Sequence, residues 1–334
     1  MSTLHLKHGQ TVVVPSELVD PLTPRVQEIL PGARLVGIDA QGRLDSYPGQ
    51  AVALLRYFPY DRYKGAFGAD RLAELVRHHG LRLVQSHSAG VDGLLSPALA
   101  ASDCVLCNAA PLHSGPMAEV VMALMLAAAK RIPVHVRNQS AHVWQRVAKD
   151  ELRGSVVGIV GFGRIGARVG ELCAAFGMRV LGMRQAAMDT PPPGIERVYG
   201  RDGLDSMLAQ SDWVVLTLPL TSASRGLLGA RELSLMKPGA CLINVARGEV
   251  VDEAALTARL QAGHLGFACL DTFQTEPLPD GNPLWDLPNV LVTPHNSASS
   301  PHMERRVIEL FLDNLQRLVT GEPLLNVVDQ DAGR

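Results

Sequence analysis

The stretch Val156–Gly166, which reads VVGIVGFGRIG, decides the fold of this chain. Its apolar, β-branched first half predicts a strand that is buried on both faces. The strand runs into a G-x-G-x-x-G turn, and a helical pattern follows over Ala167–Phe176. A strand, a glycine-rich turn and a helix in this order form the context that a dinucleotide fingerprint requires. The stretch therefore predicts a dinucleotide-binding unit.

Each glycine of the turn has a separate expected role. Gly161 permits the tight turn, Gly163 lets a pyrophosphate approach the backbone, and Gly166 lets the helix pack closely on the strand. The amides of Arg164, Ile165 and Gly166 should then point at phosphate, because they begin a helix whose dipole favours an anion there. We expect all five residues to bind the cofactor.

The composition of the chain limits the classes of protein to which it can belong. The chain has 334 residues, 47% hydrophobic residues and a formal net charge of −2, which predicts two domains and no nucleic-acid partner. We expect no membrane span, because no charge-free apolar run approaches about 20 residues. Met1–Gln10 is polar and lacks the apolar core of a secretion signal, so a cytoplasmic location is expected. The pair Cys104 and Cys107 lacks further zinc ligands, so no metal site is predicted.

Strands and helices alternate before the fingerprint, which predicts a first parallel α/β unit. Pro111–Pro116 should break this pattern. A strongly apolar helix is expected over Met117–Ala129, buried between domains or subunits, followed by a helical connection over Ile132–Val147. The expected elements of the first unit are strands at 11–14, 34–38, 51–56, 81–85 and 104–107 and helices at 21–30 and 70–79.

Polar residues follow the strands of the second unit. The strands are expected at 179–183, 213–216, 240–244, 266–270 and 290–292, with a final helix at 301–319. The carboxyl ends of parallel strands border the ligand crevice of a doubly wound sheet. Arg247, Asp271, Glu276 and His295 should therefore converge although they are scattered in the sequence.

The motifs together resemble a known family. The chain looks like a D-isomer-specific 2-hydroxyacid dehydrogenase, a family that includes glyoxylate/hydroxypyruvate reductases. The resemblance covers most of Arg82–Ala298 and is weak before Ser86. Its motifs are SHSAGVD at 86–92, the fingerprint, LPLT at 218–221, MKPGA at 236–240, LINVARGEVVDE at 242–253, LDTF at 270–273, TEPL at 275–278 and TPH at 293–295.

The resemblance implies a topology that the order of elements does not reveal. Two Rossmann-like or flavodoxin-like domains with parallel sheets are expected, with the cofactor domain inserted into the substrate domain. Residues 1–111 and 296–334 would form the substrate (catalytic) domain, and residues 112–295 the dinucleotide-binding domain. The substrate would lie between the domains, with hinges near Leu112 and Asn296. The family is usually dimeric, and we expect a homodimer built around Met117–Ala129.

The expected chemistry follows from residue types and agrees with the family's roles. Arg247 can bind a substrate carboxylate and polarise the carbonyl. His295 can protonate the developing alkoxide, while Glu276 favours the charged imidazole and fixes its tautomer. By resemblance, the amides of Ala89 and Gly90 hold the other end of the carboxylate. Also by resemblance, Asp271 binds the nicotinamide carboxamide, and Leu218, Pro219 and the Val245 carbonyl line the nicotinamide.

One departure of this sequence from the family pattern affects the expected choice of cofactor. The family usually ends its second cofactor-domain strand with an Asp for the adenosine ribose, but this chain has Arg184 about 18 residues after Gly166. An Arg offers donors and positive charge to a 2′-phosphate. We therefore expect NADP to be preferred, with NAD as the alternative cofactor.

Three interpretations stay open. The first is an NADP-dependent reductase of a small 2-keto acid such as glyoxylate or hydroxypyruvate. The second is a nucleotide-sensing, corepressor-like binding protein on the same fold. The third is a formate or phosphite dehydrogenase, against which Glu276 argues, because formate enzymes pair the histidine with Gln. Asn296 departs from the family pattern and could tune His295. The segment Arg56, Tyr57, Phe58 and Tyr60 either shapes a side-chain pocket or packs in the core.

Overall fold

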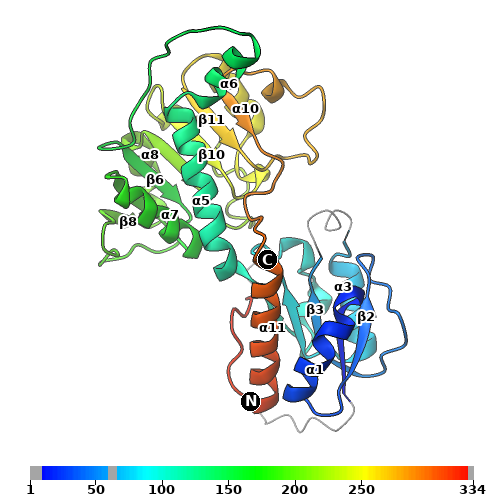
Figure 1. Cartoon of the computed structure of the whole chain (residues 1–334). Coiled ribbons are helices and arrows are strands. Elements are labelled where there is room, and N and C mark those ends of the chain that lie inside the picture. The colour runs from blue at the N-terminus through cyan, green and yellow to red at the C-terminus, as the bar shows by residue number, and fades with distance from the viewer. Residues whose placement is uncertain (1–9, 59–65, 330–334) are drawn as a thin grey trace. The chain divides into compact units, whose positions relative to one another are not determined.

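A computed structural model describes residues 10–58 and 66–329. Tyr60 and nearly all of the polar N-terminal stretch lie outside these residues. The chain divides into two compact units, one formed by residues 1–113 and 300–334 and the other by residues 114–299. The second unit is thus a continuous segment between two parts of the first (Figure 1). The domains expected from the sequence ended two to four residues earlier at each junction.

The first unit is a five-stranded parallel sheet in the order β2-β1-β3-β4-β5. This is the flavodoxin-like order of a doubly wound fold. Its first three strands are buried almost throughout, as expected for a sheet covered on both faces. The strands are β1 Thr11–Pro15, β2 Arg34–Ile38, β3 Ala51–Arg56, β4 Leu83–Ser86 and β5 Val105–Cys107.

Helices cover both faces of this sheet. Helices α1 (Val19–Ile29) and α11 (Met303–Thr320) enclose one core, and α3 (Ala69–His79) and α4 (Pro97–Ala100) enclose the other. A buried amide pair fastens the C-terminal helix to the sheet. Asn314 Nδ2 donates to Gln85 Oε1 at 2.8 Å, and Asn314 Oδ1 accepts from the Leu325 amide at 2.7 Å. Helix α11 and the segment that leads to Leu325 therefore belong to the first unit by packing and by hydrogen bonding.

The second unit is a seven-stranded parallel sheet in the order β12-β11-β10-β9-β6-β7-β8. Counted from β6, this is the Rossmann order with one further strand, and the order reverses between β6 and β9. The strands are β6 Val156–Val160, β7 Arg179–Met183, β8 Arg197–Tyr199, β9 Trp213–Leu216, β10 Cys241–Asn244, β11 Phe267–Leu270 and β12 Val290–Val292. Only β8 had no counterpart among the expected strands.

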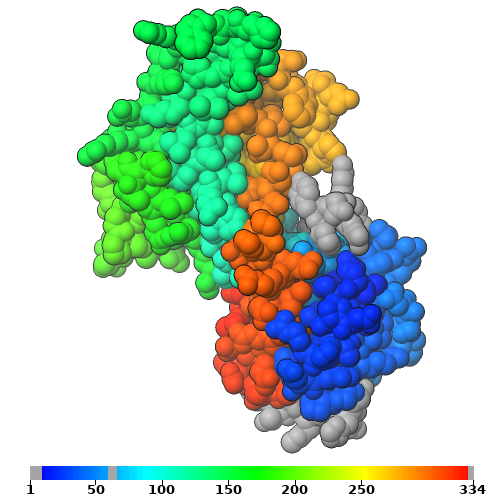
Figure 2. Space-filling view, viewed as in Figure 1, coloured from blue at the N-terminus to red at the C-terminus, as the bar shows by residue number. Residues whose placement is uncertain are grey.

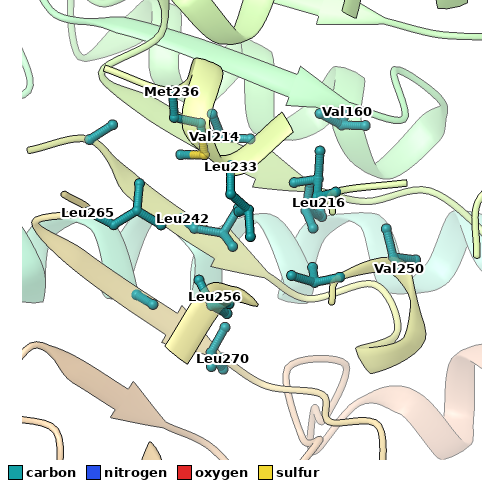
Figure 3. Close-up of a cluster of buried hydrophobic side chains, with 14 of the residues drawn as sticks. Val160, Val214, Leu216, Leu233, Met236, Leu242, Val250, Leu256, Leu265 and Leu270 are labelled. Atoms are coloured by element: carbon teal, nitrogen blue, oxygen red, sulfur yellow. The ribbon is translucent and has the colours of Figure 1, made fainter. Parts of the chain in front are cut away.

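Two apolar cores lie on the two faces of the second sheet. Helices α8 (Leu204–Gln210), α9 (Ala230–Leu235) and α10 (Glu253–Gln261) close the core drawn in Figure 3, where Leu233 and Leu256 lie among Leu216, Leu242 and Leu270. Helices α5 (Ala110–Ala129) and α7 (Arg164–Ala175) close the other. Burial on both faces explains why the strands read as continuous apolar runs rather than as alternating patterns.

Two expectations about the connection between the units are wrong. Helix α5 begins at Ala110 rather than Met117 and contains Pro116. Pro111 is its second residue, where the missing N–H has no intrahelical acceptor to lose, so it does not break the helix. Helix α6 spans only Ile132–Ser140. It stops well before Val147 because His142 has a φ of 55° and the residues beyond it bury no apolar face.

Most of α5 is covered within the second unit. Met117, Val121, Met122 and Met125 are buried in the α5–α7 core. By length and composition alone, α5 could cross a membrane, but half of that stretch is buried here, and core helices pass the same test. Several exposed apolar residues follow instead in α6 and the segment after it. Figure 2 shows the green stretch of chain that contains this segment at the surface of the unit.

Candidate active site

The fingerprint turn is packed directly against the strand on the other side of the switch point. Gly161 has a φ of 102°, and a Cβ there would lie 2.5 Å from the Leu218 amide nitrogen. A Cβ on Gly166 would lie 2.5 Å from the Gly161 carbonyl oxygen. Thr217 Oγ1 donates to the same carbonyl at 2.8 Å. Gly161 and Gly166 are therefore required by the protein's own packing.

Gly163 differs, because a Cβ there would meet no described atom within 4 Å. The first intrahelical bond of α7 runs from the Ala167 amide to the Gly163 carbonyl, so the amides of Arg164, Ile165 and Gly166 precede the helical ladder. Open space before three such donors fits a pyrophosphate, which makes this turn suitable for a dinucleotide.

Arg184 follows β7 beside this turn. The amides of Gly161 and Phe162 both donate to the Met183 carbonyl, at 2.9 and 2.7 Å, which holds the turn against the end of β7. The Arg184 amide donates to Tyr199 in β8, while its side chain is exposed. Arg184 thus directly follows the residue that holds the fingerprint turn, at the sequence position where an acidic residue would be expected.

The other expected nicotinamide contacts lie on neighbouring strand ends. Leu218 and Pro219 follow β9, and the Ser224 hydroxyl donates to the Pro219 carbonyl at 2.7 Å. Val245 follows β10, and its side chain is buried in the α5–α7 core. Only the backbone of Val245 is therefore suited to a ligand.

Arg247 is placed by a buried residue that the sequence reasoning missed. Asn244 ends β10 with 1% of its surface exposed; its Oδ1 accepts from the Ala246 amide and its Nδ2 donates to the Arg247 carbonyl. A Cβ on Gly248 would lie 1.9 Å from the Phe273 carbonyl carbon, so this loop lies directly on the segment that leads to Glu276. A polar residue at the end of an apolar run was the available signal for Asn244.

Glu276 and His295 form a hydrogen-bonded pair. His295 Nδ1 lies 2.8 Å from Glu276 Oε2, and the Phe273 amide donates to Glu276 Oε1 at 3.0 Å. Burial opposes ionisation of Glu276, but the hydrogen bonds from His295 and Phe273 and the charges of His295 and Arg247 outweigh it and lower its pKa below the ordinary 4.5. An ionised carboxylate only accepts, so Nδ1 carries a hydrogen and Nε2 is left to exchange a proton.

Asp271 lies under the turn that carries His295. It is fully buried, and its carboxylate accepts from the Thr293 hydroxyl and from the amides of Asn296 and Ser297. Asn296 thus contributes to this hydrogen-bond network through its backbone amide. Arg247, Asp271, Glu276 and His295 all lie in the second unit, at or after the ends of β10, β11 and β12.

Ala89 and Gly90 lie in the first unit, in the loop after β4. Asn108 Nδ2 donates to the Ala89 carbonyl at 3.2 Å and helps to hold the loop. Within the described ranges, the amides of Ala89 and Gly90 donate to no protein acceptor, which leaves both available to an anion.

The aromatic residues after β3 pack in the core of the first unit. Phe58 is 3% exposed and meets Phe67 edge-on at 5.9 Å. Tyr57 is 9% exposed and meets the His87 ring edge-on. The packing interpretation therefore accounts for both residues, and Tyr60 lies outside the described residues. In residues 10–58 and 66–329, no three His, Cys, Asp or Glu side chains are grouped to hold a metal ion.

A Rossmann sheet with a glycine-rich turn at its switch point, and an Arg, Glu and His at the same strand ends, defines the class of dinucleotide-binding dehydrogenases. Residues 122–297 match the family model described as "D-isomer specific 2-hydroxyacid dehydrogenase, NAD binding domain". The chain belongs to this family.

Comparison with individual relatives agrees with the assignment of the chain to this family. A glyoxylate/hydroxypyruvate reductase B of Pectobacterium atrosepticum is 36% identical over 256 residues, which cover 75% of this chain and 79% of the relative. A D-3-phosphoglycerate dehydrogenase of Methanocaldococcus jannaschii is 33% identical over 75% of the chain, but the match spans only 48% of that longer protein.

A solved structure resembles the whole chain. The D-isomer specific 2-hydroxyacid dehydrogenase of Xanthobacter autotrophicus Py2, in complex with NADPH and MES, is 33% identical, with a TM-score of 0.80. The match covers 98% of this chain and 100% of that chain.

Proposed function

We propose that this protein reduces a small 2-keto acid, of the glyoxylate or hydroxypyruvate type, to the D-2-hydroxy acid with NADPH. When bound, the cofactor supplies the hydride. The protein's residues bind the carboxylate, polarise the carbonyl and supply the proton. The second unit would serve as the dinucleotide-binding domain and the first as the substrate domain.

The observation that carries the proposal is the contact between His295 Nδ1 and Glu276 Oε2. An imidazole whose Nδ1 is held by a carboxylate keeps Nε2 as a single proton donor, and the carboxylate favours the charged ring. Reduction of a carbonyl develops negative charge on oxygen, which such a donor can neutralise. In the oxidative direction, the neutral ring would accept the proton.

Arg247 and two amides account for the carboxylate of the substrate. The guanidinium of Arg247 can bind one end of a 2-keto acid in a planar fork and polarise the adjacent carbonyl. The amides of Ala89 and Gly90, which donate to no described protein acceptor, would hold the other end. A guanidinium that binds the carboxylate and polarises the adjacent carbonyl favours an α-keto carboxylate over a simple aldehyde or ketone.

The preference for NADPH rests on Arg184. Arg184 has an exposed side chain and follows the strand end that holds the fingerprint turn. Its guanidinium can offer charge-assisted hydrogen bonds to a 2′-phosphate and has no acceptor for a ribose diol. The structural relative from Xanthobacter autotrophicus Py2 was solved with NADPH, which supports the same choice. The other cofactor-binding residues that we propose are Gly161, Gly163, Arg164, Ile165, Gly166, Leu218, Pro219, Val245 and Asp271.

A panel of keto acids tests the proposal. Glyoxylate, hydroxypyruvate, pyruvate and a phosphorylated hydroxypyruvate would each be offered with NADPH and with NADH, while cofactor oxidation is followed at 340 nm. We expect turnover with a small keto acid and NADPH. Tight cofactor binding without turnover of any keto acid would instead favour a nucleotide-sensing protein.

We also propose a homodimer, but on a different surface from the one expected. The apolar side chains of α5 are largely used within the unit. Exposed apolar residues follow in α6 and the next segment: Ile132, Val136 and a fully exposed Trp144. A second copy would cover them. Light scattering at micromolar concentration should give the mass of a dimer. Trp144→Ser should lower this mass, whereas Trp285→Ser, at another exposed tryptophan, should not. A monomeric wild type would contradict the proposal. A cytoplasmic location stays a prediction.

A further inference from the structure

We propose that Asp271 is a positioning residue, which holds the turn that carries His295 in the conformation needed for proton transfer. This inference rests on the proposed function, because it gives His295 the role of proton donor. It concerns the protein's own geometry, however, and can be tested separately from turnover.

The hydrogen-bond donors to Asp271 bracket His295 in the sequence. Oδ1 accepts from the Thr293 hydroxyl at 2.6 Å and from the Asn296 amide at 3.1 Å. Oδ2 accepts from the Ser297 amide at 3.0 Å. One carboxylate thus ties down the chain two residues before His295 and again directly after it.

The turn between these anchor points is strained at His295. Its φ is 52°, a left-handed conformation that residues other than glycine adopt rarely. The His295 amide closes a tight turn onto the Thr293 carbonyl at 3.0 Å. Such a conformation persists only where the surroundings hold it, and the described contacts that do so meet at Asp271.

The burial of Asp271 makes these contacts interdependent. The side chain is completely inaccessible to solvent. A buried carboxylate requires donors, and here a hydroxyl and two amides supply them. Loosening the turn would leave the charge without partners, so the carboxylate and the strained turn stabilise each other.

Two acidic residues therefore hold His295 in different ways. Glu276 holds the imidazole ring through Nδ1, whereas Asp271 holds the backbone. Both act from the segment that follows β11, because the Phe273 amide, two residues after Asp271, holds Glu276 in turn. The short stretch from Asp271 to Glu276 fixes the position of the proton donor.

A pair of isosteric variants tests the role of Asp271. Thr293→Val removes the hydroxyl that donates to Asp271. Thr272→Val is the matched control, because Thr272 is a buried threonine next to Asp271 in the sequence and its hydroxyl has no hydrogen-bond partner among the described residues. Asp271→Asn removes the charge itself. For each variant we would measure kcat, the dissociation constant of NADPH, and the titration of the His295 ring by NMR.

We expect Thr293→Val to lower kcat by roughly tenfold and Asp271→Asn by roughly a hundredfold. The NADPH dissociation constant should change less than about twofold in Thr293→Val, which leaves the Asp271 carboxylate in place, and Thr272→Val should resemble the wild type. If Thr293→Val instead weakened NADPH binding while kcat at saturating cofactor was unchanged, the contact with Asp271 would serve the cofactor rather than His295, and the proposal would be wrong.

The NMR measurement separates this inference from the proposed function. If the wild type reduced no keto acid, the proposed function would fail, but the His295 titration should still change in Thr293→Val and not in Thr272→Val. An identical titration in these two variants would overturn the positioning role whatever the activity. Thr293→Val also provides this test if Asp271→Asn does not fold.

Discussion

His295 Nδ1 donates to Glu276 Oε2 across 2.8 Å, and the two residues, 19 positions apart in the sequence, link the segments that follow β11 and β12. The lowered pKa of Glu276 follows from this contact, the Phe273 amide and nearby positive charge, which outweigh burial. Glu276 should therefore remain ionised throughout the pH range from about 5 to 8, since its ordinary pKa is 4.5.

The first prediction concerns the pH dependence of reduction. Reduction consumes a proton, which the imidazole beside ionised Glu276 supplies, so kcat/KM should fall as pH rises. Glu276→Gln removes that charge, and the basic limb of the kcat/KM profile should move to lower pH. Glu276 should cause no acid limb between about pH 5 and 7, because it stays ionised there. A basic limb that did not move would show that the pair does not control proton transfer.

Removal of the Arg247 side chain should abolish nearly all keto-acid reduction. Hydrogen bonds to charged groups contribute about 1.5–3 kcal/mol each, so losing two should lower kcat/KM by roughly a hundredfold or more. NADPH binding should stay close to normal in Arg247→Ala. Arg225→Ala is the control, because Arg225 is exposed and pairs with Glu249 in the neighbouring loop. Similar kcat/KM values for the two variants would refute the carboxylate-binding role.

Arg184→Asp should reverse part of the cofactor preference. A contact between arginine and phosphate worth about 2 kcal/mol corresponds to roughly thirtyfold in affinity. The variant should bind NADPH more weakly by about that factor and change little toward NADH. Arg168→Asp makes the same charge change on α7, where the wild-type residue pairs with Glu171, and should have a much smaller effect. Equal effects of both substitutions would indicate that the overall electrostatic field of the protein, rather than a contact with the 2′-phosphate, sets the preference.

The buried amide pair should contribute to folding rather than to catalysis. Asn314→Ala leaves Gln85 Oε1 and the Leu325 amide without their partner, and should lower the free energy of unfolding by about 2–4 kcal/mol. Gln316→Ala, at an exposed position on the same helix, should change it by less than about 0.5 kcal/mol. Urea denaturation measures both, and equal values would mean that this network does not anchor α11.

Much of the fold could be predicted because the strands are buried on both faces. Such strands read as short apolar runs, and β2, β3, β7, β9 and β12 have the expected boundaries. The connection between the units was harder to predict. Pro111 is harmless at a helix start, and the helical pattern after Ser140 has no apolar surface to pack on. Strand β8 reads Arg-Val-Tyr with a single buried residue, so it lacks the apolar run that identified the equally short β12.

The candidate site was predictable in part for a similar reason. Arg247, Glu276 and His295 directly follow strand ends or lie a few residues beyond them, so a parallel sheet brings them together. The positive φ of His295 and the contacts of Asp271 with Thr293, Asn296 and Ser297 carry no sequence pattern. They depend on which backbone amides face a buried carboxylate, and only coordinates reveal that.

The most direct test of the central claim is the rate of NADPH oxidation by the purified protein with glyoxylate or hydroxypyruvate. We expect turnover that yields the D-2-hydroxy acid, a higher kcat/KM with NADPH than with NADH, and near-complete loss in Arg247→Ala. Absence of turnover with every 2-keto acid in the panel, from a protein that still binds NADPH, would contradict it.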